Sequence, residues 1–280
     1  MTEHVLRGRE VGAPMRAKVD VVIVGSGAGG AVVARELARA GLSVLVLEEG
    51  GHYTPEEYGA LPPTQSIRRI AREAGLNAAV GLGDTPLISV LAGKCVGGSS
   101  VLTGGVIFRI PDDILHDWST NLGLTELTPE GLDPFFSEME ETVHVETVPE
   151  SMRSRSTQLF VEGAAKLGIP MKSLRRNTHD CKGAARCNFG CPNRAKMSVD
   201  ISVLPDAYAA GARVWADALV ERVDITGGVA RGVRGRFLDQ ETGEPRVPFD
   251  VRARLVVVAC GSLHSPLLLR RSGLDGPHIG

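Results

Sequence analysis

The sequence has 280 residues, with 31 lysines and arginines against 33 aspartates and glutamates, and a formal net charge of −2. This balance, together with only 4% aromatic residues, gives no electrostatic or stacking basis for binding nucleic acid. No stretch reaches the roughly 18 apolar residues that a membrane span needs, and the charged N-terminus lacks the apolar core of a secretory signal. The composition therefore predicts a cytoplasmic, enzyme-like protein without a transmembrane segment.

The first predicted unit is a strand, a helix and a second strand. Residues 19–25 form a run of β-branched apolar residues that ends in glycine, typical of a strand buried on both faces. A helix is predicted over 29–40, because Gly41 stands where a helix commonly ends. Residues 43–48 repeat the buried-strand pattern, so this segment predicts a right-handed βαβ unit.

The loop inside this unit has the spacing of a dinucleotide-binding loop. Residues 25–30 read GSGAGG, which fits G-x-G-x-x-G between a strand and a helix. Gly25 permits the tight turn, Gly27 lets the backbone approach a pyrophosphate, and Gly30 lets the helix pack closely on the strand. The helix N-terminus offers free N–H groups to the phosphates, and Ala28, just before it, is a further candidate cofactor contact. Glu48 ends the second strand and would accept hydrogen bonds from a ribose diol, which favours FAD or NAD over NADP.

Further helices and strands are predicted downstream. The stretch 112–145 has helical, acidic patterning, with Thr128 and Pro129 as a helix start. The other expected helices cover 66–75, 157–168, 202–210 and 262–271. Strands are expected over 213–225 and 229–238, joined by a hairpin turn at Gly227 and Gly228, and over 247–252 and 254–259, the last of them buried.

Two later motifs resemble the signatures of a known family. Residues 97–105 (GGSSVLTGG), followed by FRIP at 108–111, resemble the first signature of the glucose–methanol–choline oxidoreductase family. Residues 259–269 (ACGSLHSPLLL), with Ser272 and Gly273, look like its second signature. Together with the glycine loop, these motifs stand in the family's order across 20–112 and 180–273.

The resemblance implies an enzyme that binds FAD and oxidises an alcohol by hydride transfer to the flavin. In that family the glycine- and serine-rich loop lies along the flavin and the pyrophosphate, which assigns cofactor contacts to Gly97, Gly98, Ser99, Ser100, Thr103 and Gly104. Thr103 stands where the family often has asparagine, and Cys260 where it usually has a small residue such as alanine. By the family pattern, Val220 offers backbone groups to the adenine.

Three clustered cysteines, Cys181, Cys187 and Cys191, have several interpretations. Thiolates spaced around glycines, with a proline after the last, can hold an iron–sulfur cluster, and some sugar dehydrogenases of the same family place cysteines similarly. Zinc is a further alternative, with His179 as a fourth ligand. We favour a structural loop without metal, in which the three cysteines lie close together.

The resemblance also predicts how the chain is organised. The expected fold is α/β: a Rossmann-like FAD-binding domain with a parallel sheet and a β-meander, built from 18–112 and 181–280, with part of a substrate domain inserted at 113–180. The family's catalytic histidine comes from a segment far beyond the second signature. We therefore expect an N-terminal fragment, assign no catalytic residue, and leave the alcohol substrate and the electron acceptor unidentified. A non-catalytic flavin-binding or electron-transfer module that works with a partner chain is the alternative.

Overall fold

A seven-stranded sheet forms the centre of the computed structural model, which describes residues 4–81 and 83–279. Its strands are β1 (Val5–Arg7), β2 (Met15–Val24), β3 (Val44–Leu47), β8 (Arg213–Ala216), β9 (Ala218–Thr226), β10 (Val229–Leu238) and β11 (Pro245–Val258). They lie in the order β1-β8-β3-β2-β11-β10-β9. The first five run parallel, and β11, β10 and β9 form an antiparallel meander. The predicted α/β class with a largely parallel sheet is confirmed.

Apolar side chains cover both faces of this sheet. Along β3, Val44 and Val46 enter one core while Leu45 and Leu47 enter the other, which explains why the strand is apolar at every position. The first core also contains side chains from α1 (Ala28–Arg39) and α8 (Leu204–Ala209). The second core contains the meander's Phe237 and Phe249 together with Trp215, with ring centroids 5.3–5.9 Å apart. The parallel strands are therefore a middle layer, with helices on one face and the side chains of the meander on the other.

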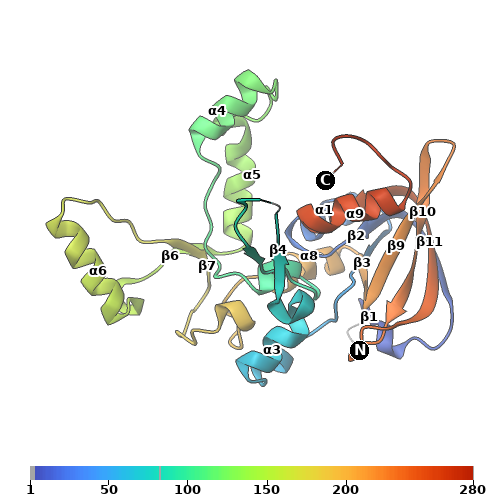
Figure 1. Cartoon of the computed structure of the whole chain (residues 1–280), viewed down its shortest axis with the longest axis horizontal. Coiled ribbons are helices and arrows are strands. Elements are labelled where there is room, and N and C mark those ends of the chain that lie inside the picture. Colours follow the sequence, from blue (N-terminus) through green and yellow to red (C-terminus); the bar gives the residue numbers. More distant parts are fainter. Residues whose placement is uncertain (1–3, 82, 280) are drawn as a thin grey trace.

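The remaining elements are short or lie away from the sheet. The helices are α2 (Pro55–Gly59), α3 (Pro63–Ile70), α4 (Asp112–Asn121), α5 (Pro129–Thr142), α6 (Arg155–Lys166), α7 (Val199–Ser202) and α9 (Gly261–Arg271). Two small ladders pair β4 (Asn77–Ala79) with β5 (Ile88–Val90), and β6 (Val145–Thr147) with β7 (Arg175–Asn177). Figure 1 shows α4, α5 and α6 extending away from the sheet. No described helix is long and apolar enough to cross a membrane.

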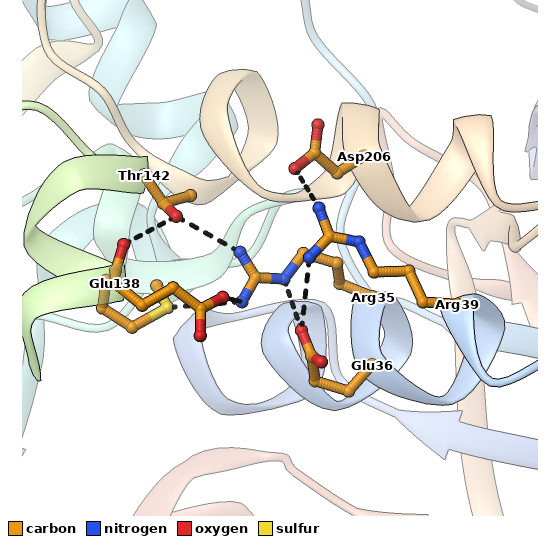
Figure 2. A network of polar contacts seen from close by, with 7 residues as sticks. Arg35, Glu36, Arg39, Glu138, Thr142 and Asp206 are labelled. Atoms are coloured by element: carbon orange, nitrogen blue, oxygen red, sulfur yellow. Dashed lines mark hydrogen bonds and ion pairs between the residues drawn. The ribbon is translucent and has the colours of Figure 1, made fainter. Parts of the chain in front are cut away.

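A buried arginine connects the extended helices to the core. The Arg35 side chain on α1 is only 3% exposed and donates to Glu138 of α5 at 2.7 Å and to Glu36 at 2.6 Å. It also donates to Thr142, 3.3 Å away. One turn along α1, Arg39 pairs with Asp206 of α8 at 2.8 Å (Figure 2). The start of α1, which carries the glycine loop, therefore belongs to a helix that is held from two sides.

The strand expected over 213–225 is two strands. Asp217 has a φ of 56° and separates β8 from β9. Its carboxylate accepts a hydrogen bond from the Gly8 N–H at 3.1 Å. Strand β8 then continues the parallel layer, whereas β9 enters the meander. The short strand β1, which the sequence analysis did not anticipate, pairs with β8 beside this break.

Two further sequence predictions differ from the structure. The expected helix over 66–75 is α3, which ends at Ile70 because Glu73 and Ala74 have φ of 47° and 54°. The segment 254–259 is strand as expected, but Leu255 is 48% exposed. Its register explains the exposure, since β10 pairs with β11 only up to Arg252 and the following residues pair with β2 alone. At Gly227 and Gly228 the hairpin is confirmed, with φ of 58° and 75°.

The carboxyl group of Asp217, between β8 and β9, should make the free energy of unfolding depend on pH. Burial raises the pKa of Asp217 to about 6, against the hydrogen bond from Gly8 and the charges of Arg9 and Arg7. The folded protein therefore favours the protonated carboxyl group of Asp217. This preference adds to the free energy of unfolding in full below about pH 4, and the added free energy is lost as the pH rises through about 6. Asp217→Asn keeps an acceptor for Gly8, carries no charge and suits positive φ. We expect the variant to gain about 1–2 kcal/mol in free energy of unfolding at pH 7.5.

Urea unfolding of both proteins at several pH values checks this expectation. The difference between variant and parent should approach zero at pH 3.5 and reach its plateau above pH 6.5. A difference of the same size at every pH would show that the charge of Asp217 has no part in it.

Candidate functional site

One large cavity opens where the carboxyl ends of β2 and β3 meet the start of α1. Its volume is about 740 Å³, which lies within the usual range for small-molecule and cofactor sites. Eight of the residues that the sequence predicts as cofactor contacts line it: Gly25, Gly27, Ala28, Glu48, Gly98, Ser99, Ser100 and Val220. Residues that are far apart in the chain therefore meet at one surface.

The start of α1 presents uncapped backbone to this cavity. Gly27 is the N-cap residue and has no side-chain cap, and the first turn of the helix contains no acidic residue. The unpaired N–H groups and the positive end of the helix dipole favour an anion at this position. A methyl group added to Gly27 would have only the Gly98 backbone within 4 Å, at 3.9 Å, so the loop keeps this space open without needing it for folding.

Glu48 and Ser26 join the two glycine loops. The buried Glu48 carboxylate accepts from the Ser26 N–H at 3.0 Å, the Ser26 hydroxyl at 2.7 Å and the Gly50 N–H at 2.9 Å. The Ser26 hydroxyl in turn accepts from the Gly97 N–H at 3.1 Å. Burial raises the pKa of Glu48, and these hydrogen bonds oppose that rise. Ser26 was not predicted as a site residue, although it lies inside the first glycine motif.

The second loop closes against the first. Gly98 has a φ of 57°, and a methyl group on it would lie 2.8 Å from the Gly27 Cα, so this approach of the two loops needs glycine at position 98. The hydroxyl of Ser99 accepts from the Gly93 N–H at 2.9 Å, and that of Ser100 donates to the Gly97 carbonyl at 2.7 Å. These bonds hold Gly98–Val101 as a short 3-10 turn beside α1.

The ion pair between Glu49 and Arg72 forms another wall of the cavity. Glu49 accepts from Arg72 at 2.6 and 3.0 Å and pairs with Lys94 at 3.3 Å. Burial raises the pKa of Glu49, but Arg72 and Lys94 lower it more, so this pKa lies below its ordinary value. The Nε of Arg72 is buried and has no hydrogen-bond partner among the described residues. The sequence gives no indication of Arg72, because the pattern around it is weak and only the fold brings it to the cavity.

Strand β9 and helix α9 supply the apolar side. Val220 is buried and lines the cavity with Leu263 and Leu267 of α9. The two leucines are about half exposed, which their position on the cavity wall explains. Cys260 lies at the N-cap of α9 on the same wall, and burial raises the pKa of its thiol to about 12. This side suits a flat, largely apolar group.

Four predicted contacts do not line the cavity. Gly30 is buried under the Gly25 carbonyl and the Ala259 side chain, which agrees with its expected role in helix–strand packing. Gly97, with a φ of 94°, lies against Asp200 and Val101. Thr103 and Gly104 follow the 3-10 turn and lie outside the cavity lining.

The three clustered cysteines do not form a metal-holding group. Cys187 accepts from the Arg176 guanidinium at 2.8 Å, and Cys191 is buried. Across residues 4–81 and 83–279, no group of three or more histidine, cysteine, aspartate or glutamate side chains is arranged to hold a metal ion. The iron–sulfur and zinc interpretations of Cys181, Cys187 and Cys191 therefore gain no support from the geometry.

Known proteins are similar to this chain in sequence. The chain matches the family model described as GMC oxidoreductase over residues 19–280. It is 40% identical over 269 residues to an uncharacterized GMC-type oxidoreductase of Mycobacterium tuberculosis, covering 96% of this chain and 41% of that protein. It is 32% identical over 273 residues to a long-chain-alcohol oxidase of Arabidopsis thaliana, covering 95% of this chain and 35% of that protein.

Solved structures share the fold. Pyridoxine 4-oxidase from Mesorbium loti superposes with a TM-score of 0.69 at 20% identity, covering 93% of this chain and 54% of that chain. An FAD-dependent oxidoreductase from Chaetomium thermophilum gives a TM-score of 0.64 at 19% identity, with 91% and 48% coverage. The chain thus spans from about a third to about a half of the length of these proteins. The resemblance seen in the signatures is confirmed, and the chain belongs to the GMC oxidoreductase family.

Proposed function

We propose that the cavity binds FAD and that this chain is the FAD-binding part of an oxidoreductase that acts on the CH–OH group of an alcohol. The observation that carries the proposal is that the two glycine loops meet on one cavity, with Gly27 and Gly98 back to back and Ser26 hydrogen-bonded to Gly97. Neither loop alone would indicate a flavin dinucleotide in preference to another nucleotide.

The residues that line the cavity fit the parts of FAD. The uncapped start of α1 would receive the pyrophosphate, and the unpartnered Arg72 Nε offers a further donor to an anion. Glu48 would accept from the ribose hydroxyls, because each carboxylate oxygen can accept more than one hydrogen bond. The backbone of Val220 would meet the adenine, and the hydroxyls of Ser99 and Ser100 would lie toward the flavin end.

The reaction type follows from the family and its members. FAD, when bound, supplies the oxidant that accepts a hydride from the alcohol carbon. This chain's residues would bind and orient the cofactor, and the proposal assigns no general base to them. The name of the Arabidopsis relative, a long-chain-alcohol oxidase, supports an alcohol as the substrate class.

Equilibrium binding tests the cofactor assignment. The purified chain, freed of flavin, should quench FAD fluorescence on titration, and FMN and NAD in excess should fail to displace FAD. FMN lacks the adenosine that Glu48 and Val220 would hold, and NAD lacks the flavin that the second loop would face. If the chain bound NAD and not FAD, the flavin assignment would be wrong.

A further inference from the structure

Lys196 is among the largest fully buried side chains of the described residues, and it is a cation. It is only 2% exposed. Its position, between the cysteine segment and α7, gave no signal in the sequence. Burying an unpaired ammonium is costly, so a lysine at such a place requires partners for its charge.

Three carbonyl oxygens supply those partners. The Lys196 ammonium donates to Val101 O at 2.6 Å, Thr103 O at 2.8 Å and Cys187 O at 2.7 Å. An ammonium has three N–H donors, so all of them are used. Burial lowers the pKa of Lys196 to about 8, and the nearby Asp200 carboxylate opposes this fall, so the ammonium form predominates at neutral pH.

These bonds act on the loop that borders the cavity. The N–H groups of Leu102 and Thr103 both donate to the Ser99 carbonyl, at 3.0 and 3.1 Å. A shift of the Thr103 backbone would therefore move Ser99, which lines the cavity. The stem of Lys196 also passes beside Gly105, where an added methyl group would lie 3.5 Å from its Cδ and Cγ.

A second cation holds the same loop to the same segment. Arg176 donates from Nε to the Gly104 carbonyl at 2.9 Å and from Nη2 to the Cys187 sulfur at 2.8 Å. The carbonyls of three loop residues, Val101, Thr103 and Gly104, thus face two cations, and both cations contact Cys187. This arrangement gives the cysteine segment a role without metal, as an anchor behind the loop.

We propose that Lys196 is a positioning residue for the cofactor, which fixes residues 98–103 against the anchor and so sets how tightly FAD is retained. The inference rests on the proposed function. A methionine of similar volume would fill the same space if packing were the whole requirement, so the three hydrogen bonds are the feature that distinguishes the lysine.

Two substitutions separate the hydrogen bonds from the volume. Lys196→Met keeps the volume and removes all donors, whereas Lys196→Gln is shorter but keeps two N–H donors. We expect FAD affinity to fall at least about 10-fold in Lys196→Met and less in Lys196→Gln. A role in packing alone gives the reverse order. Amide hydrogen exchange in the flavin-free chain should rise in 98–105 and 187–190 more than elsewhere, for each variant.

The controls keep the outcomes distinct. Arg153→Met, which removes contacts to Glu150 and Ser173 away from the cavity and the loop, should leave FAD affinity within about twofold of the parent. If the unaltered chain failed to bind FAD, the proposed function would fail, while the exchange pattern would still test the anchor. A folded Lys196→Met variant with parental affinity would overturn the inference, as would exchange that rises evenly along the chain. Should Lys196→Met not fold, the same two criteria apply to Lys196→Gln.

Discussion

Replacing Gly27 with valine is expected to abolish FAD binding while the fold remains. The added side chain has space in the protein itself, since a Cβ at this position meets only the Gly98 backbone at 3.9 Å. It would instead occupy the approach of the pyrophosphate to the start of α1. We expect a loss of at least about 100-fold in affinity, measured by flavin fluorescence, with an unchanged circular dichroism spectrum and melting temperature.

Two other glycines provide the comparison. Gly163→Val, on α6, adds the same side chain where a Cβ meets nothing within 4 Å, and should leave FAD binding unchanged. Gly30→Val should instead lower stability, because its Cβ would collide with the Gly25 carbonyl oxygen. Parental affinity in a folded Gly27→Val variant would contradict the placement of the pyrophosphate at α1.

Replacing Arg35 with methionine is expected to cost about 2–3 kcal/mol in free energy of unfolding. The guanidinium is almost fully buried and donates to Glu36, Glu138 and Thr142. Methionine retains much of the packing, so most of the loss comes from the charged hydrogen bonds between α1 and α5 (Figure 2). Chemical denaturation gives the free energy, and amide exchange in α5 shows whether the loss is at this contact.

Arg39→Met is the matched control, one turn along the same helix. The Arg39 side chain is 46% exposed and its partner Asp206 is 45% exposed, so solvent screens the pair. We expect a cost below about 1 kcal/mol. Equal losses in the two variants would show that burial does not decide the contribution of these arginines.

The sequence predicted those elements whose conformation depends on residues close to them in the chain. The βαβ unit was readable because alternate residues of β3 and of the second half of β2 enter opposite cores, which makes β3 and residues 21–24 apolar at every position. The αL conformation at Asp217 was not readable, because it is associated with contacts from Gly8 and Gly50, far away in the chain. Strand β1 has only three residues and depends on β8 for its partner, so no periodicity marks it.

The same distinction applies to the site. Gly25, Gly27 and Glu48, which line the cavity, could be predicted because their proposed roles follow from a short motif in one unit. Val220 and the loop at 97–100 needed the family resemblance. Arg72 and Lys196 were missed, because a charged residue in a chain normally predicts solvent exposure and only the fold places these two beside the cavity and the loop.

The register of the central sheet has a consequence for how the chain acquires its structure. Strand β2 pairs with β3 soon after it is made, yet its other neighbour is β11, with Val19 beside Ala253. During synthesis one edge of β2 therefore stays unpaired until the helices α4 to α6 have already emerged. Closing so long a loop is entropically slow, which favours folding in seconds rather than microseconds. A nascent chain that exposes the apolar residues 21–24 of such a strand is the kind of species that chaperones bind.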